Sequence, residues 1–421
     1  PRLRGPFLFR KRSQDNQLAA IQSRLGSEDG LLEYFWGEKQ LYAFGIDQEG
    51  IRVHHIPLTK HLVDSLKAWR SFISSSGLAE QNAYSASAIQ TFSQQAHYFY
   101  QLLVQPLFDQ LPTRLRLAKD GLLGIIPFDI LLTSEANESH YGQLPYLLRS
   151  SVLRTVYSGE WLLGDFVPNA SADELYGGFA PQYAFANSSA SSQAASRGIR
   201  SVQFTDLRHN RSEVASVAQL LDGSATLGRE ATEISFKSSA DHYRILHLAM
   251  HAYTDDERPA FSGLVFSPAD TLQEDGFLHA YEIAQMPLNA ELAVLSACNT
   301  GNGQLRPGEG VMSLARAFSL AGCPRVVMSL WAADDVTTNQ LMDAFFDKIK
   351  AGKSVDEALQ QAKLQYLAES DLNHPYYWSA FVMLGEKGAV SNKGGLHYWL
   401  VGGLLLLLVG IGVWAKRRRI S

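Results

Sequence analysis

Short apolar strands alternate with helices from residue 211 to residue 384, and this pattern limits the possible folds of the chain more than any other feature. Apolar runs of strand length are separated by stretches whose apolar residues recur three and four positions apart. Over about 180 residues, such alternation predicts a mostly parallel α/β sheet flanked by helices on both faces. In sheets of this kind, active residues gather at the carboxyl ends of the strands.

The expected elements of this region are assigned from apolar periodicity and turn residues. The strands are expected at 225–227, 243–248, 263–266, 292–296, 325–330 and 378–384. The helices are expected at 211–221, 230–238, 279–285, 309–320, 337–350 and 354–368. Before them, we expect three strands within 31–57, helices at 60–73 and 86–103, a hairpin over 113–128, and strands at 152–156 and 174–179.

Two of the expected strands end in a turn of small residues that carries one reactive side chain. HLAMHA, residues 247–252, brings His251, and ELAVLSACNTG, residues 291–301, brings Cys298. If both strands are parallel and end at the same edge of the sheet, the imidazole and the thiol meet although 47 positions separate them. We expect His247, which lies inside its strand, to belong to the core.

A cysteine beside a histidine is the arrangement of a nucleophile and its base. An ordinary thiol is mostly protonated at neutral pH, and a histidine that takes its proton produces the reactive thiolate. The small residues that follow Cys298 would let a peptide backbone approach closely. The backbone N–H groups of Cys298 and Ala252 are the candidate oxyanion donors. The sequence therefore predicts a cysteine endopeptidase that acts on protein or peptide substrates.

The composition excludes several other classes of protein. The chain has 421 residues, 46% hydrophobic and 19% charged, and its net charge of −5 gives no sign of nucleic-acid binding. Its two cysteines, Cys298 and Cys323, cannot form a disulfide framework or a cysteine-based zinc site, and we expect no metal and no cofactor. Spacings typical of serine hydrolases, zinc hydrolases or P-loop proteins are missing from the sequence. Cys323 is expected to pack between a helix and a strand.

Residues 181–211 form a long segment rich in Ser, Ala, Asn and Gly. The length exceeds that of most connections in a compact domain. It carries Arg197, Arg200, Arg208 and Arg211, so it is either a solvated surface loop or a site that the protein's own activity processes.

The C-terminus carries 18 uncharged residues, 398–415, followed by four consecutive cations, 416–419. As a helix this run would be about 27 Å long, close to the thickness of the hydrocarbon core. Aromatic residues stand at both of its ends, as is typical of an interface. The run therefore predicts a single-pass helix in contact with membrane lipid. The charge bias favours the non-cytoplasmic side for the catalytic part, although a cytoplasmic domain on a tail anchor remains open.

Several ordered motifs together resemble the CHAT domain, a caspase-related peptidase module that often follows TPR repeats. They are HLAMHA, SGLVFS, ELAVLSACNTG, GEGVMSLARAFSLAGCPRVVMSLWAADD and HPYYWSAFVMLG, preceded by PFDILL and YLLRSSVLRTVYS. The resemblance covers roughly residues 86–385. It implies a caspase-like fold with His251 as base and Cys298 as nucleophile. The chain departs from many relatives in having Ala252 after the histidine where they have glycine. No TPR period is visible in this chain, so any such repeats are expected upstream of Pro1. A regulatory partner is the other expected interaction.

Relatives of the caspases often cleave after basic residues through an acidic S1 pocket, and this resemblance suggests three candidates here: Asp335, Asp334 and Glu309. Asp335 is the first choice among them, and helix N-capping ahead of Thr337 explains Asp335 almost as well. The alternative function is a catalytically silent scaffold or signalling module that keeps the fold.

The expected division of the chain combines these features. It is an N-terminal α+β segment at 1–85, a CHAT-like domain at 86–386, a linker at 387–397, a transmembrane helix at 398–415 and a basic tail at 416–421.

Overall fold

The computed structural model describes residues 17–75, 83–164, 172–183, 204–255, 257–268, 274–296, 298–299, 309–332 and 334–391. For residues 298–299, 309–312 and 335 it describes only the backbone. Within these ranges, eleven strands form one sheet in the order β3-β2-β1-β4-β5-β15-β14-β12-β8-β6-β7. In that order their bounds are Ile51–Pro57, Gln40–Ile46, Asp29–Trp36, Arg114–Ala118, Val152–Val156, Phe381–Gly385, Arg325–Ser329, Leu292–Leu295, Tyr243–Leu248, Glu174–Pro181 and Ser224–Gly228.

The sheet is mostly parallel, but it consists of two parts that run in opposite directions. β1, β4, β5 and β15 are parallel to one another, and β14, β12, β8, β6 and β7 are parallel to one another. β15 and β14, which join the two parts, pair antiparallel. The carboxyl ends of β14, β12 and β8 therefore share one edge of the sheet.

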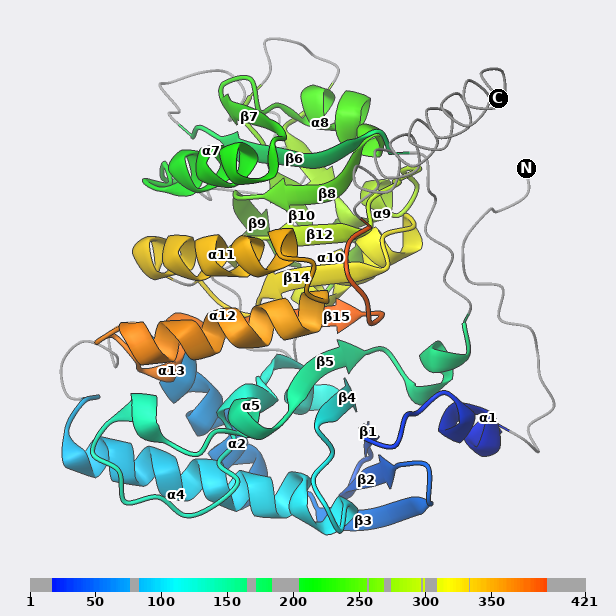
Figure 1. The fold of residues 1–421 in the computed structure, drawn as a ribbon, viewed down its shortest axis with the longest axis vertical. Helices are drawn as coiled ribbons and strands as arrows, with labels where there is room; N and C mark the ends of the chain where they lie inside the picture. Colours follow the sequence, from blue (N-terminus) through cyan, green and yellow to red (C-terminus); the bar gives the residue numbers. More distant parts are fainter. Residues whose placement is uncertain are drawn as a thin grey trace, which may run out of the picture.

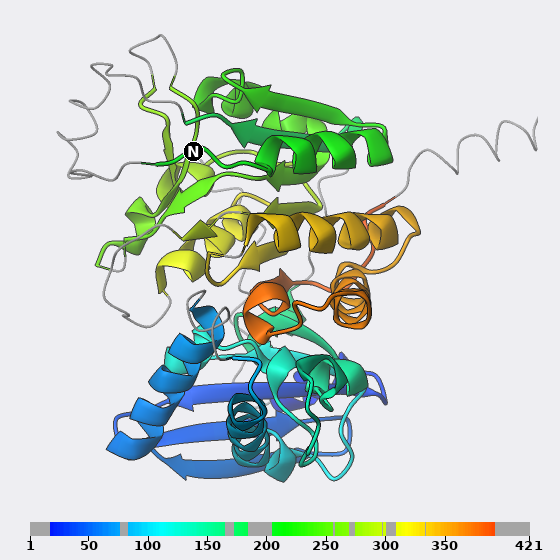
Figure 2. The same ribbon diagram turned by 90° about the vertical axis from the view of Figure 1, so that its left-hand side faces the viewer.

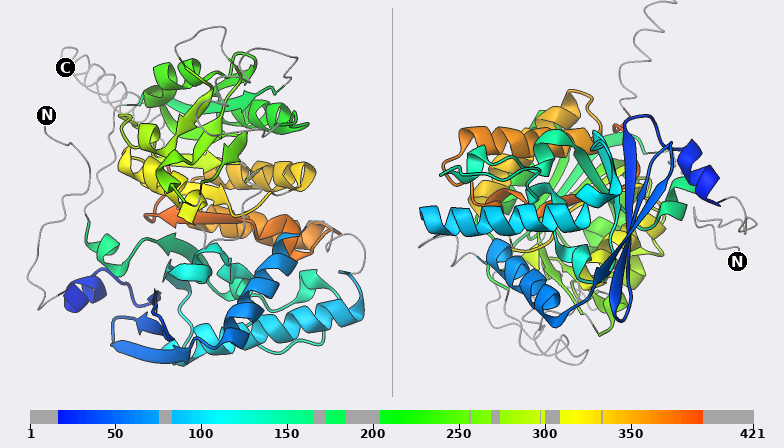
Figure 3. Two further views of the ribbon diagram at one scale, coloured as in Figure 1. Left: turned by 180° about the vertical axis from the view of Figure 1, so that it is seen from behind. Right: turned by 90° about the horizontal axis from the view of Figure 1, so that it is seen from below.

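Helices cover both faces of the sheet. Figure 1 shows α7 (Asn210–Leu221), α11 (Asp335–Lys350) and α12 (Val355–Glu369) side by side over one face. α10 (Glu309–Leu320) lies on the opposite side (Figure 2). Seen from below, α2 (Lys60–Ser74) and α4 (Ala86–Leu103) lie on the same side of the β1–β3 strands (Figure 3). The remaining described α-helices are α1 (Gln17–Ser23), α5 (Leu147–Ser150), α8 (Glu233–Ser239), α9 (Ala280–Ile283) and α13 (Pro375–Trp378).

The 3₁₀ turns connect these elements. They are η2 (Gln105–Leu107), η3 (Gly121–Ile125), η4 (Phe128–Ile130), η5 (Tyr141–Gln143), η6 (Gly159–Leu163), η7 (Ala240–His242) and η8 (Pro259–Phe261).

The prediction of a flanked, mostly parallel α/β sheet is confirmed. The strands of the central part are fully buried runs, as helices on both faces require: every residue of β8, β12 and β14 is buried. The strands predicted within 31–57 join this same sheet, because β1 pairs with β4 in parallel. How the chain divides into domains stays a prediction.

The hairpin predicted over 113–128 is wrong. β4 is parallel to both of its neighbours, β1 and β5, so neither edge is left for a second hairpin strand. The Asp-Gly pair instead begins η3: the Asp120 carboxylate accepts the Gly121 N–H at 2.8 Å, and Gly121 adopts φ +56°. The apolar residues that follow are buried in 3₁₀ turns.

The predicted membrane span is corrected as well. No helix in the described ranges has the length and apolar character that crossing a bilayer requires. Even α4, at 18 residues the longest helix described, alternates buried apolar residues with exposed polar ones, because it covers a sheet. Residues 398–415 lie outside the described residues. The predicted localisation in a membrane by a single-pass helix is therefore not supported by the described residues.

His374 makes the stability of the fold depend on pH. Its ring is completely buried, its Nδ1 accepts the Tyr376 N–H at 3.1 Å as the N-cap of α13, and burial lowers its pKa from 6.5 to about 4. Because the folded-state pKa is the lower one, the contribution to stability is complete above pH 6.5 and is lost as the pH falls through about 4. We expect the free energy of unfolding to drop by about 3 kcal/mol over this window.

The measurement is urea unfolding at a series of pH values for the wild type and for His374→Asn. Asparagine can still accept the capping hydrogen bond but does not titrate, so the pH dependence of its unfolding should be weaker. Equal pH dependence in the two proteins would show that His374 is not the titrating group.

Candidate functional site

The strands that precede His251 and Cys298 lie side by side, and their last residues are paired. β8 and β12 are parallel neighbours in which Leu248 is opposite Leu295. His251 lies three residues after Leu248, and Cys298 lies three residues after Leu295. Equal offsets from paired residues bring both positions to the same edge of the sheet.

Beyond this edge the chain forms a second sheet that the sequence did not predict. Its order is β11 (Phe277–His279), β10 (Gly263–Val265), β9 (His251–Tyr253) and β13 (Cys298–Asn299), counted over the described residues. β9 and β13 pair in parallel, with Cys298 opposite His251. Paired positions in neighbouring strands have backbones about 5 Å apart. The backbones at the two candidate positions are therefore adjacent.

The His251 ring lies against two aromatic rings, and the residue as a whole is only 4% exposed. Its centroid lies 4.6 Å from that of Tyr183 and 5.3 Å from that of Phe204. The His251 N–H donates to the Tyr183 hydroxyl at 3.0 Å, and this hydroxyl donates to the Val265 carbonyl at 2.7 Å. The contacts fix both the backbone and the ring of the histidine.

A backbone carbonyl selects the tautomer of His251. Nε2 lies 2.7 Å from the carbonyl oxygen of Thr205. A carbonyl can only accept, so Nε2 carries the proton, and in the neutral ring Nδ1 is the nitrogen with the lone pair. Nδ1 is therefore the atom that can take up a proton.

An ion pair lies next to this aromatic cluster. Asp206 accepts the Tyr183 N–H at 3.2 Å and pairs with Arg211 at 3.0 Å. The hydrogen bond from the Arg211 guanidinium lowers the pKa of Asp206. The hydrogen bond from the Tyr183 N–H to Asp206 fastens residues 204–206, and with them the Thr205 carbonyl, against the segment that carries Tyr183.

These histidine contacts were not foreseen from the sequence, which suggested only a surface loop or a processing site at 181–211. Tyr183 and Phe204 lie within that segment, on either side of residues 184–203, and both are buried. The only signal was two aromatic residues at the borders of a polar, small-residue stretch. Residues 184–203, including Arg197 and Arg200, lie outside the described residues, so processing stays a prediction.

His247 has both ring nitrogens occupied inside the core. Nδ1 lies 2.8 Å from the Tyr176 hydroxyl and Nε2 lies 2.9 Å from Glu213 Oε1, and the residue is completely buried. It has no access to an outside substrate, in agreement with its expected place in the core.

Cys323 is also a core residue. It is completely buried, its thiol donates to the Arg325 carbonyl at 3.2 Å, and burial raises its pKa to about 12. A thiol with this pKa stays protonated and unreactive at neutral pH.

The other predicted site residues lie on neighbouring elements. Ala252 belongs to β9, between β10 and β13, and is buried. Glu309 begins α10 and Asp335 begins α11, both with only the backbone described. Asp334 is the N-cap of α11. The role of each in oxyanion or substrate binding stays a prediction.

The capping role that the sequence suggested for Asp335 belongs to Asp334 instead, because Asp334 has the extended backbone of an N-cap and Asp335 is already the first residue of the helix. The Oδ1 atom of Asp334 accepts the N–H groups of Val336 and Thr337, each at 3.1 Å.

We expect Asp334→Ala to lower the free energy of unfolding by about 1 kcal/mol, because these two N–H groups in the first turn of α11 lose their acceptor. Urea unfolding measures this, with Asp334→Asn as the matched control that keeps a capping oxygen. A loss of equal size in both variants would mean that charge, rather than the cap, is what stabilises the helix.

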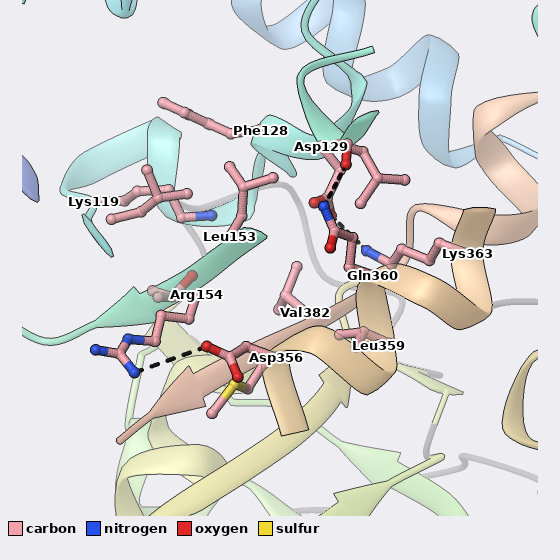
Figure 4. A pocket seen from close by; sticks show the side chains of 14 residues that line it. Lys119, Phe128, Asp129, Leu153, Arg154, Asp356, Leu359, Gln360, Lys363 and Val382 are labelled. Carbon is pink, nitrogen blue, oxygen red and sulfur yellow. Dashed lines mark hydrogen bonds and ion pairs between the residues drawn. The ribbon is translucent and has the colours of Figure 1, made fainter. Parts of the chain in front are cut away.

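A pocket lies away from this edge, between β4, β5 and β15 and the helix α12 (Figure 4). Its carboxylates are already paired, Asp129 with Lys363 and Asp356 with Arg154 at 3.9 Å. Burial lowers the pKa of Lys119, on its wall, to about 8. Because each of its carboxylates already has a cation as partner within the fold, we regard the pocket as part of the packing of α12 on β4, β5 and β15.

One group of three carboxylates in the described ranges has the spacing of a metal site, but a lysine ammonium group already contacts all three. The oxygens of Glu233, Glu274 and Glu282 lie within 4.8 Å of one another. Lys237 Nζ contacts all three, at 2.7, 3.0 and 3.1 Å. The ammonium group supplies the positive charge that a metal ion would bring.

The flanked, mostly parallel sheet is that of an α/β protein. Residues 94–386 match the family model of the CHAT domain. The chain belongs to the CHAT domain family, in agreement with the motifs of its sequence.

The relatives are much longer proteins. The chain is similar to tetratricopeptide repeat protein 28 of Homo sapiens, with 26% identity over 171 residues, which are 41% of this chain and 7% of that protein. The Mus musculus protein of the same name is 25% identical over 119 residues, which are 28% of this chain and 5% of that protein. The chain thus matches only a small part of each relative.

The backbone is also similar to those of solved structures, and two of them follow with their TM-scores. One belongs to a Saccharomyces cerevisiae separase–securin complex, with 10% identity, a TM-score of 0.48, and coverage of 88% of this chain and 30% of that chain. The other is the Arg-specific cysteine proteinase gingipain R, with 11% identity, a TM-score of 0.37, and coverage of 79% and 76%.

Proposed function

We propose that the chain is a cysteine endopeptidase domain in which Cys298 is the nucleophile and His251 the base. The observation that carries this proposal is the pairing of β9 with β13, with Cys298 opposite His251. Membership of the CHAT domain family supports it.

The hydrogen bond of His251 supports the base role. With its proton on Nε2 and donated to Thr205, the neutral imidazole takes the thiol proton on Nδ1 and becomes an imidazolium. The thiolate of Cys298 then attacks the carbonyl carbon of the scissile peptide bond. The imidazolium returns the proton to the leaving amine, and a water molecule hydrolyses the thioester that remains.

Two further roles belong to the proposal. The backbone N–H groups of Cys298 and Ala252 would stabilise the oxyanion. Asp335 and Glu309 would bind a basic P1 side chain, whereas Asp334 already uses one carboxylate oxygen for the N-cap of α11. We also propose that the domain acts on protein substrates and that a TPR-containing or other partner regulates it.

The test is hydrolysis of a peptide library, varied at P1, by the wild type and by Cys298→Ala. A cysteine peptidase cleaves a subset of the library and the variant cleaves none of it. A wild type that binds peptides without cleaving any would instead be the silent scaffold. Cleavage only after acidic or apolar residues would exclude Asp335 and Glu309 as binders of a basic P1 side chain.

A further inference from the structure

A third strand end lies at the same edge as His251 and Cys298. β14 is the parallel neighbour of β12, and Met328 is opposite Leu295. Trp331 lies three residues after Met328, the same offset that places Cys298 after Leu295 and His251 after Leu248. Residues 330–332 therefore border the candidate site next to the cysteine.

An arginine from outside the family match holds this segment. Arg70 belongs to α2, whereas the match begins at residue 94. Its Nη2 donates to the Leu330 carbonyl at 2.9 Å, and its guanidinium lies over the Trp331 ring, 4.6 Å from the centroid. The contact joins residues 260 positions apart in the chain.

The opposite side of the segment is held by α13. The Trp331 indole N–H donates to the Tyr376 carbonyl at 3.1 Å, and the Tyr376 hydroxyl donates to the Ala332 carbonyl at 2.9 Å. α2 itself packs on the start of α13, with the Phe72 ring 5.2 Å from that of His374. Residues 330–332 are thus held between α2 and α13.

Stability alone does not explain an arginine at this position. Arg70 is only 6% exposed, and within the described residues no carboxylate pairs with it and its Nε and Nη1 find no hydrogen-bond acceptor. Burial lowers its pKa to about 10, which still leaves it charged at neutral pH. A buried cation without a counter-ion is costly, and an apolar side chain of similar length would avoid that cost.

We propose that Arg70 is a positioning residue that fixes residues 330–332 as a wall of the peptide-binding cleft, so that the N-terminal segment takes part in substrate binding. This inference rests on the proposed function. Arg70 acts on peptide binding through Leu330 and Trp331, and it does not touch the reacting atoms. A small thiol reagent needs no such wall, whereas a peptide does.

The experiment compares two rates of Cys298 modification, by a pool of peptidyl acyloxymethyl ketones varied at P1 and by iodoacetamide. We expect Arg70→Met to lower the ratio of the peptidyl rate to the iodoacetamide rate about tenfold, the size expected when a hydrogen bond from a charged donor is lost. Arg70→Lys keeps the charge and restores part of the ratio. Tyr376→Phe removes the bond to Ala332 from the other side and lowers the ratio in the same direction. Lys67→Met, an exposed change one turn earlier on α2, leaves it unchanged.

The outcomes separate this inference from the proposed function. An unchanged ratio in both Arg70→Met and Tyr376→Phe overturns the role of the wall, even if the wild type cleaves peptides. An iodoacetamide rate that falls in parallel with the peptidyl rate also overturns it, because the change would then be a general loss of structure. Failure of the proposed function appears differently, as a wild type whose cysteine has no preference for peptidyl reagents and whose iodoacetamide rate does not depend on His251.

Discussion

Cys298→Ala abolishes hydrolysis of every peptide that the wild-type protein cleaves. The methyl group of alanine cannot attack a carbonyl carbon, so the covalent route is lost. Removal of a nucleophile from a catalytic pair commonly lowers kcat on the order of 10³-fold to 10⁶-fold. The measurement is the initial rate of cleavage, followed by mass spectrometry, with each variant at the same concentration.

Cys323→Ala is the matched control for this change. It removes the other thiol of the chain, which is buried and has a pKa of about 12, so activity should remain close to that of the wild type. Cleavage that survives in Cys298→Ala but is lost in Cys323→Ala would show that Cys323, and not Cys298, is the nucleophile. Cleavage that survives in both would exclude a cysteine mechanism.

His251→Gln lowers kcat by about 10²-fold to 10⁴-fold, the usual contribution of a positioned general base. Glutamine is similar in length and can offer an amide N–H to the Thr205 carbonyl, but it takes up no proton at neutral pH. The folded structure should therefore survive while proton transfer is lost. Steady-state kinetics on the best peptide of the library measures the effect.

The control for the histidine is His55→Ala. His55 is exposed on β3, the outermost strand of the other end of the sheet, and its change should leave kcat unaltered. A kcat in His251→Gln equal to that of the wild type would remove the histidine from the mechanism, even if Cys298 proved essential.

The regular elements could be predicted from the sequence where local signals agreed. α4 and α10 have the predicted bounds, Ala86–Leu103 and Glu309–Leu320, and so does β8. For α4 the local signal was strong, since Ser85 caps its first turn by accepting the Ala88 N–H at 3.2 Å and its apolar residues have helical spacing.

Elements that depend on distant partners were missed. β9 and β13 have three and two residues, too few to show a period of two, and they are strands because β9 pairs with both β10 and β13. The hairpin at 113–128 failed for a related reason, because the Asp-Gly signal is local whereas the parallel neighbours of β4 come from far along the chain. An apolar run at the C-terminus has the length of a membrane span, but no described helix supports one.

The candidate site was partly predictable for a geometric reason. His251 and Cys298 follow their strands at the same offset, so a parallel register is enough to bring their backbones together. The residues that hold the histidine, Tyr183, Phe204 and Thr205, come from the borders of a segment without periodicity. Such contacts depend on tertiary packing that no local pattern records.

The most direct test of the pair is the pH dependence of the rate at which iodoacetamide modifies Cys298 in the native protein, with and without His251. Cys323 is buried with a raised pKa, so the native rate reports on Cys298. We predict that the wild type reacts well below the ordinary thiol pKa of about 8.5 and that His251→Gln shifts the reaction up to that value. Identical pH profiles in the two proteins would contradict the pairing of Cys298 with His251.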